Sequence, residues 1–306
     1  MRAVDALLEG LVDYAGLFPP ASESMEQALA AYASYLDGPD RNALGRFIVP
    51  LSRLTEFEET ASEFLPRQTG SEPWKLSVIV TGDISAAASE MTGFNRRHSE
   101  SSRDGAAVID VAEVKASSTS EIERQRSGLP ESFTSYFEIP LDGDIPALLA
   151  SVAKTKSRAK IRTGGVTTDS FPPAEKIIDF LIAAHREGVA FKATAGLHHP
   201  VRGAYRLTYE PGSASGTMYG FLNVFLAAAL VAVGGTRDDA HALLEEMDSS
   251  AFSFSDDAIV WRRHRFGLER IRASRAEFAM SFGSCSFREP LDELDTVTRT
   301  AGVGAR

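Results

Sequence analysis

The chain has 306 residues, of which 43% are hydrophobic and 24% charged, a composition typical of globular proteins rather than disordered or fibrous ones. Its 32 basic and 42 acidic residues give a formal net charge of −10. This charge disfavours nucleic acid and anionic membranes as partners, because both attract positive surfaces. The single cysteine, Cys285, cannot form a disulfide within the chain. We therefore expect a cytoplasmic protein that acts on a small molecule.

Short β-branched or aromatic runs alternate with amphipathic stretches along most of the chain. The candidate strands are residues 16–20, 45–50, 75–81, 106–114, 134–141, 158–164, 190–196 and 278–283. The amphipathic stretches at residues 24–36, 54–65, 145–156 and 172–188 predict helices between them. Strict alternation of strand and helix predicts a mainly parallel sheet with helical crossovers.

Eight such strands are expected to close into a (β/α)₈ TIM-type barrel, an α/β fold, as one domain over residues 1–306. The chain is longer than the roughly 250 residues usual for such a barrel, and the additional residues lie at 200–277. This segment predicts a helical insertion between strands seven and eight. Residues 278–283 are expected to pair with the first strand near Leu17, and residues 252–254 compete for this place. An open doubly wound sheet is the alternative, because alternation alone does not report closure.

Three helices are predicted inside the insertion, near residues 218–233, 236–247 and 262–276. The first is apolar almost all round, contains Asn223, and falls short of the roughly 20 residues that a bilayer requires. Such a helix needs cover on more than one side. We expect it to pack beneath the two helices that follow it, or against a second copy in a homo-oligomer.

The carboxyl ends of the predicted strands carry the residues expected to do chemistry. The fifth strand offers Glu138, the sixth Lys160 and Arg162, and the seventh Lys192 and Thr194. Because side chains alternate along a strand, each pair on strands six and seven shares a face. A buried lysine beside another cation loses its proton more easily, and the neutral amine can attack a carbonyl to form a Schiff base.

Residues 160–200, KIRTGGVTTDSFPPAEKIIDFLIAAHREGVAFKATAGLHHP, resemble the sixth to seventh strands of the deoxyribose-phosphate aldolase type of class I aldolase. The pattern of that family there is K-x-x-T-G, a helix, and F-K-x-x-G-G. GAAVIDVAEV at residues 105–114 is similar to the family's fourth strand, and SFGSCSF at 281–287 resembles its eighth. The resemblance covers roughly residues 105–286, with the insertion interrupting it. It implies a barrel lyase that needs no cofactor.

The resemblance implies a role for each residue that matches a motif. Lys160 would form the Schiff base, and Lys192 would lower the pKa of Lys160. Asp110 would be the acid/base that moves protons through water. Gly283 and Ser284 would contact a substrate phosphate.

The chain departs from the family motifs at two places beside the proposed nucleophile. Arg162 replaces a small residue, and the added cation favours a carboxylate or phosphate substrate. Ala195 replaces the first glycine of the strand-seven pair, while Gly196 keeps the second. Together with Thr194, Arg162 and Gly196 are our candidates for substrate binding.

Other interpretations of these residues remain open from the sequence. A buried lysine can simply pair with a carboxylate such as Glu138. Asp110 faces the helices if the register instead turns Glu113 and Lys115 inward. A barrel that has lost catalysis and binds partners through its insertion is also compatible with the sequence.

His198 and His199 suggest a metal-dependent alternative. Either histidine, together with Glu138, is a candidate ligand set for a divalent ion in a lyase, isomerase or hydrolase. Adjacent residues on an extended chain point to opposite sides, so at most one is expected to face the site. Cys285 has no histidine near it in the sequence and is expected to be a small buried thiol. The favoured prediction remains a class I aldolase-like lyase acting on a small anionic carbonyl substrate.

Overall fold

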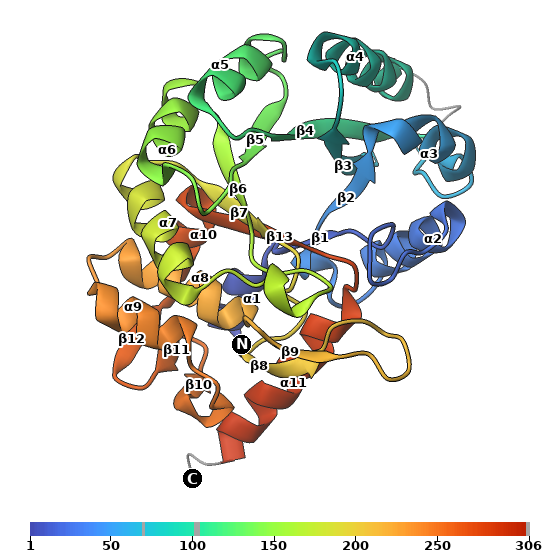
Figure 1. Ribbon diagram of the computed structural model, residues 1–306. Coiled ribbons are helices and arrows are strands. Elements are labelled where there is room, and N and C mark those ends of the chain that lie inside the picture. The colour runs from blue at the N-terminus through green and yellow to red at the C-terminus, as the bar shows by residue number, and fades with distance from the viewer. Residues whose placement is uncertain (69–70, 101–104, 304–306) are drawn as a thin grey trace.

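The computed structural model describes residues 1–68, 71–100 and 105–303, and its centre is a closed barrel of parallel strands (Figure 1). Around the barrel the strands follow the order β1, β13, β7, β6, β5, β4, β3, β2. Their bounds are β1 Val12–Tyr14, β2 Leu44–Pro50, β3 Trp74–Val80, β4 Ala107–Lys115, β5 Thr134–Glu138, β6 Arg158–Arg162, β7 Phe191–Thr194 and β13 Ala279–Ser284. The predicted (β/α)₈ fold class is confirmed.

Helices surround the barrel and connect its strands (Figure 1). Their bounds are α1 Arg2–Leu8, α2 Met25–Leu36, α3 Leu54–Ala61, α4 Ile84–Glu100, α5 Thr119–Ser127, α6 Ile145–Lys154, α7 Ala174–Arg186, α8 Phe221–Val231, α9 Arg237–Leu244, α10 Leu268–Glu277 and α11 Arg288–Val303. Local signals fix several boundaries. Ser24 and Gln27 form a capping box at the start of α2, and Gly188, with φ +65°, follows the end of α7. Among the described helices, none is both long and apolar enough to cross a membrane.

The barrel closes between its first and last strands, but the first strand is not where the sequence predicts it. Residues 16–20 form a turn, and β1 lies just before them, with Val12 opposite Phe282 and Tyr14 opposite Ser284. All three residues of β1 are buried, so the strand shows no alternation of apolar and polar side chains by which the sequence could reveal it. The prolines of the turn, for their part, have no N–H to donate to a neighbouring strand. The expected closure by residues 278–283 is confirmed, although the partner is Tyr14 rather than Leu17.

The insertion at residues 200–277 is mixed rather than only helical. It holds α8, α9 and α10, but also two small antiparallel sheets. One sheet pairs β8 (Gly203–Arg206) with β9 (Ser215–Met218), and the other joins β10 (Phe252–Phe254), β11 (Ala258–Trp261) and β12 (His264–Gly267). Residues 252–254 are therefore no barrel strand. The helix predicted from residue 262 starts only at Leu268, because β12 precedes it.

The apolar helix of the insertion is covered by the chain's own elements. Every residue of α8 is buried, and the helix packs against β13, α7, α9 and α10. The prediction that the two following helices cover it is confirmed. Its one polar residue is satisfied, because the Asn223 amide donates to the carbonyls of Leu243 and Glu246 and accepts from the backbone N–H of Arg202.

Candidate active site

A cavity of about 420 Å³ lies at the carboxyl ends of the barrel strands. Its wall includes the last residues of β4, β5, β6 and β7, namely Lys115, Glu138, Arg162 and Thr194. This is the end of a (β/α)₈ barrel at which active sites are found. The cavity is therefore the candidate active site.

Lys160 stands between two carboxylates in this cavity. It lies on β6 and its side chain is almost fully buried, yet it contributes to the cavity wall. Its Nζ is 2.7 Å from Glu113 Oε2 and 2.8 Å from Glu138 Oε2. The amine of Lys160 thus faces the cavity with a proton acceptor on either side.

Lys192 lies on the neighbouring strand and pairs with Lys160 in the β6–β7 register. Its Nζ is 2.5 Å from Asp13 Oδ2 and 2.6 Å from Glu113 Oε1. Glu113 therefore bridges the two lysines, with one oxygen on each. Unlike Lys160, Lys192 is absent from the described cavity wall and is enclosed by protein.

The charges of this cluster stabilise one another. Burial opposes the ionised form of Glu113, but Lys160 and Lys192 outweigh it and hold the pKa of the carboxyl far below its usual range. Burial likewise opposes ionisation of Glu138, and Lys160 again lowers its pKa. Asp13 and Glu113 raise the pKa of Lys192 against the effect of burial. Lys192 is therefore a fixed ammonium ion, and both carboxylates beside Lys160 are ionised at neutral pH.

Hydroxyl and amide donors position the carboxylates of the cluster. Ser77 Oγ donates to Glu113 Oε1 at 2.6 Å, and Ser281 Oγ donates to Asp13 Oδ2 at 2.8 Å. The backbone N–H of Arg46 donates to Asp13 Oδ1 at 2.8 Å. The sequence interpretation missed Asp13, Ser77 and Ser281. A serine at an inward position of an apolar strand was the available signal for the last two.

Asp110 does not occupy the place that the aldolase resemblance gives it. Its carboxylate accepts two hydrogen bonds from Arg46, from Nε and Nη2, both at 2.7 Å. The β3–β4 register shifts between Leu76 and Ser77, so a bulge lies beside Asp110 and the strand turns Glu113 toward the lysines. The register alternative that directs Glu113 inward is the one observed, and Glu113 takes the position between the lysines.

Most of the expected substrate-binding residues do meet around the cavity. Arg162, Thr194, Gly196 and Gly283 all contribute to its wall together with Lys160. Ser284 is buried instead, and its Oγ accepts a hydrogen bond from Ser286 N at 3.3 Å. Its side chain is thus engaged in holding the turn after β13.

The loops after β6 and β7 approach each other closely at the cavity. Ala195 and Gly196 both have positive φ angles, 62° and 75°. A Cβ on Gly196 would lie 2.9 Å from the Cα of Gly164 and 2.9 Å from the ring of Phe171. Only glycine fits there, which gives the glycines of the strand-six and strand-seven motifs a packing role.

His198 contributes to the cavity wall and belongs to a second polar network. Its Nδ1 is 3.3 Å from Glu289 Oε2 and 3.9 Å from Cys285 Sγ. Burial lowers its pKa, but the hydrogen bonds with Cys285 and Glu289 outweigh burial and raise it to about 9. His198 is therefore a cation at neutral pH. Cys285 is buried as expected, and the histidine beside it is 87 residues away in sequence, which local motifs cannot report.

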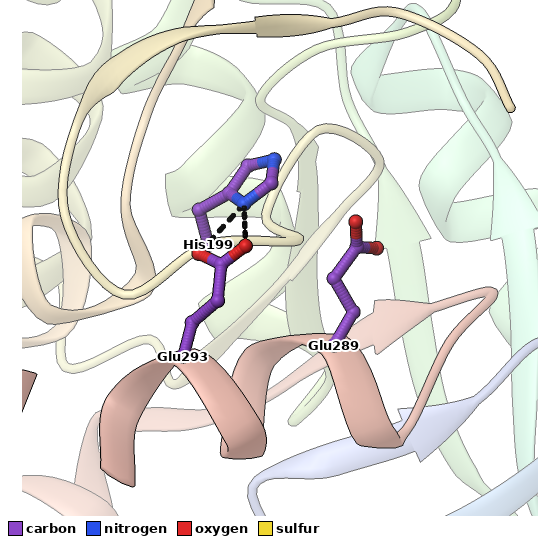
Figure 2. A group of neighbouring side chains, drawn as sticks. All are labelled: His199, Glu289 and Glu293. Carbon is purple, nitrogen blue, oxygen red and sulfur yellow. Dashed lines mark hydrogen bonds and ion pairs between the residues drawn. The ribbon is translucent and has the colours of Figure 1, made fainter. Parts of the chain in front are cut away.

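Of the two histidines, His198 lines the cavity and His199 does not, as expected for adjacent residues. Its Nδ1 is 2.9 Å from both carboxylate oxygens of Glu293, and Glu289 lies on the same side (Figure 2). Among the described residues, these three form the group whose ligand atoms are close enough to hold a metal ion. The predicted metal alternative paired a histidine with Glu138, and the structure places Glu138 with Lys160 instead.

Comparison of the chain with protein-family models, curated proteins and solved structures finds no match. The function is therefore inferred from the geometry of the cavity.

Proposed function

We propose that the protein is a class I aldolase-type lyase in which Lys160 forms a Schiff base with a small anionic carbonyl substrate. One observation carries the proposal: the cavity presents a buried amine held between two carboxylates, with a second lysine fixed behind it. Lys192 is enclosed by protein and held as an ammonium ion, so of the two buried lysines Lys160 is the one that a substrate can reach.

The chemistry requires that Lys160 first give up a proton. Glu138 is the acceptor nearest the open side of the cavity, because its side chain is 12% exposed against 1% for Glu113, and its Oε2 lies 2.8 Å from Lys160 Nζ. The neutral amine then attacks the carbonyl carbon, and the carbonyl oxygen leaves as water after taking up one proton from the amine nitrogen and one from Glu138. This step forms the carbon–nitrogen bond of the iminium ion.

The iminium ion accepts an electron pair from the adjacent carbon–carbon bond, which breaks to leave an enamine on Lys160. The departing fragment becomes an aldehyde when its hydroxyl gives a proton to a carboxylate. A proton returned to the enamine carbon and hydrolysis by water release the second product. The reverse order of steps forms the bond.

Glu113 suits a role as the inner proton carrier. Oε1 is occupied by Lys192 and Ser77, whereas Oε2 points to Lys160. Although Oε2 forms an ion pair with Lys160, it receives no well-directed hydrogen bond from the residues the structure describes. The 2.7 Å distance from Lys160 Nζ puts Oε2 within reach for proton transfer to and from the amine.

An anionic substrate is favoured by the cations of the cavity wall. Arg162 is about half exposed at the rim, with Nε 3.8 Å from Glu138 Oε1, so its guanidinium remains accessible to a ligand. His198 adds a positive charge from the loop after β7. A carboxylate or phosphate next to the reacting carbonyl would be attracted by both.

The proposal is tested by borohydride trapping of the full-length chain. We expect incubation with small carbonyl compounds, including acetaldehyde, pyruvate and dihydroxyacetone phosphate, followed by borohydride, to add one reduced adduct to the mass of the protein. Lys160→Met should abolish the adduct. Lys154→Met is the matched control, because Lys154 is exposed on α6 and pairs with Glu123 at the surface. An adduct that persists in Lys160→Met, or none with any carbonyl, would contradict the proposal.

A further inference from the structure

A second group of potential ligands lies outside the lysine cluster. His199 follows β7, and Glu289 and Glu293 stand one turn apart on α11, where both side chains extend from the same face of the helix and Glu293 reaches His199 (Figure 2). One ring nitrogen of His199 and one oxygen of each carboxylate lie within 4.8 Å of one another, and Nδ1 is the nitrogen that contacts Glu293. His199 is buried, whereas the Glu293 side chain is 41% exposed and gives the group access to solvent. These residues are unused in the proposed lyase chemistry.

We propose that His199, Glu289 and Glu293 bind one divalent transition-metal ion, of which zinc is the best-fitting example. An imidazole nitrogen with two carboxylate oxygens is a donor set that suits zinc and its neighbours, while magnesium and calcium prefer oxygen alone. Three protein ligands leave a fourth position of a tetrahedral ion open to water. Nδ1 is the nitrogen on the side of the two glutamates. To bind an ion through Nδ1, the neutral imidazole must carry its proton on Nε2, which is one of its two tautomers.

The distances allow coordination after a small movement. Ligands about 2.1 Å from a tetrahedral ion stand roughly 3.4 Å apart, so a separation of up to 4.8 Å must shrink by at most about 1.4 Å. Rotation of the two glutamate side chains supplies this movement, because both are partly exposed. The backbone need not move.

Neighbouring side chains already orient two of the ligands. Tyr209 Oη donates to Glu289 Oε2 at 2.9 Å, and His198 contacts the same oxygen, so Oε1 is the oxygen available to an ion. The ring of Tyr205 stacks on the His199 ring with centroids 3.4 Å apart. Such outer contacts fix ligand orientation in metal sites.

The site is independent of the Schiff-base proposal. Its ligands contact neither Lys160 nor Lys192 among the described residues, and it would bind metal whether or not Lys160 reacts. It adjoins the cavity through His198, which lines the cavity and contacts Glu289, and through Tyr209, which donates to Glu289 and lies 3.8 Å from Cys285 Sγ in the cavity wall. Metal binding and borohydride trapping can therefore fail separately.

The test is equilibrium dialysis of the full chain, first stripped with a chelator, against Zn²⁺ and against Co²⁺. We expect one ion per chain, and the visible absorption of Co²⁺ should show low-symmetry coordination by nitrogen and oxygen. Glu293→Gln and His199→Asn should each weaken binding by at least about 100-fold. Tyr209→Phe, which removes only an outer contact, should weaken it by about 10- to 100-fold.

The chain offers a matched control at the surface. His241 also lies near two glutamates, but its Nε2 approaches Glu175 at 3.3 Å and its Nδ1 approaches Glu245 at 3.5 Å, so they do not converge on one point. His241→Asn should leave the affinity unchanged. Unchanged affinity in Glu293→Gln, or loss of binding in Cys285→Ala with retention in Glu293→Gln, would overturn the proposal.

Discussion

Lys192→Met tests the role assigned to the buried charges of the barrel. Lys192 is only 1% exposed and contacts Asp13 and Glu113 within 2.6 Å, so its removal leaves two carboxylates without their shared cation. Removing one partner of a buried ion pair typically costs about 3 to 5 kcal/mol. At about 1.4 kcal/mol per factor of ten, the unfolding equilibrium should shift by roughly 10²- to 10⁴-fold.

The loss should depend on pH in a defined direction. The pKa of Glu113 is lowered in the folded state, so its ion pairs contribute stability above about pH 4.3, the unfolded value, and this contribution is lost as the pH falls further. The pKa of Lys192 is raised, so its contribution persists up to about pH 10.4. Without Lys192, the buried carboxylates can take up protons as the pH falls. The stability gap between the wild type and Lys192→Met should therefore be widest from about pH 6 to 10 and narrow toward pH 4.

Urea denaturation followed by circular dichroism measures this gap. Lys154→Met is the control, since Lys154 is 72% exposed and its pair with Glu123 should contribute less than about 1 kcal/mol. Adding Asp13→Asn to Lys192→Met should recover part of the loss by removing one unpaired charge. If Lys192→Met is as stable as the wild type at pH 7, or if its deficit is the same at pH 4, the electrostatic interpretation is wrong.

Three further predictions concern the cavity. Glu138→Gln should slow borohydride trapping at Lys160 by about 10²- to 10⁴-fold at neutral pH, measured by protein mass against time, because it removes a proton acceptor; an unchanged rate would remove Glu138 from the mechanism. Arg162→Leu should raise the concentration of an anionic carbonyl needed for half-maximal trapping about tenfold without affecting a neutral aldehyde, and equal effects on both would argue against charge recognition. Gly196→Ala should lower the unfolding free energy by about 2 to 4 kcal/mol, because its methyl group meets backbone at 2.9 Å. In Gly188→Ala, which has φ +65° but nothing within 4 Å, only about 1 to 2 kcal/mol should be lost.

The alternation of strand and helix predicted a parallel α/β fold, and the eight candidate strands favoured closure into a barrel over an open sheet. The two lysines fell on consecutive predicted strands. Lys160 and Lys192 are indeed opposite each other in the β6–β7 register. This pairing could be predicted from the sequence, because consecutive parallel strands joined by a helical crossover usually lie next to each other in the sheet. The short strand β1 was missed, because its three residues are all buried and show no alternation of apolar and polar side chains.

The detailed site depended on features that a sequence pattern does not encode. The irregular register at Leu76 and Ser77 decides that Glu113, and not Asp110, faces the lysines. A bulge shifts the alternation by one residue and turns the following side chains to the other face. His198 precedes the insertion and Cys285 follows it, so their contact could not be predicted from local sequence either.

The Schiff base at Lys160 is tested most directly by tandem mass spectrometry of the wild-type protein after incubation with a small carbonyl compound and borohydride. We predict that the reduced adduct lies on the peptide that contains Lys160, at one equivalent per chain. An adduct on Lys192, an adduct spread over surface lysines such as Lys154, or no adduct with any carbonyl compound would contradict the assignment of Lys160 as the nucleophile.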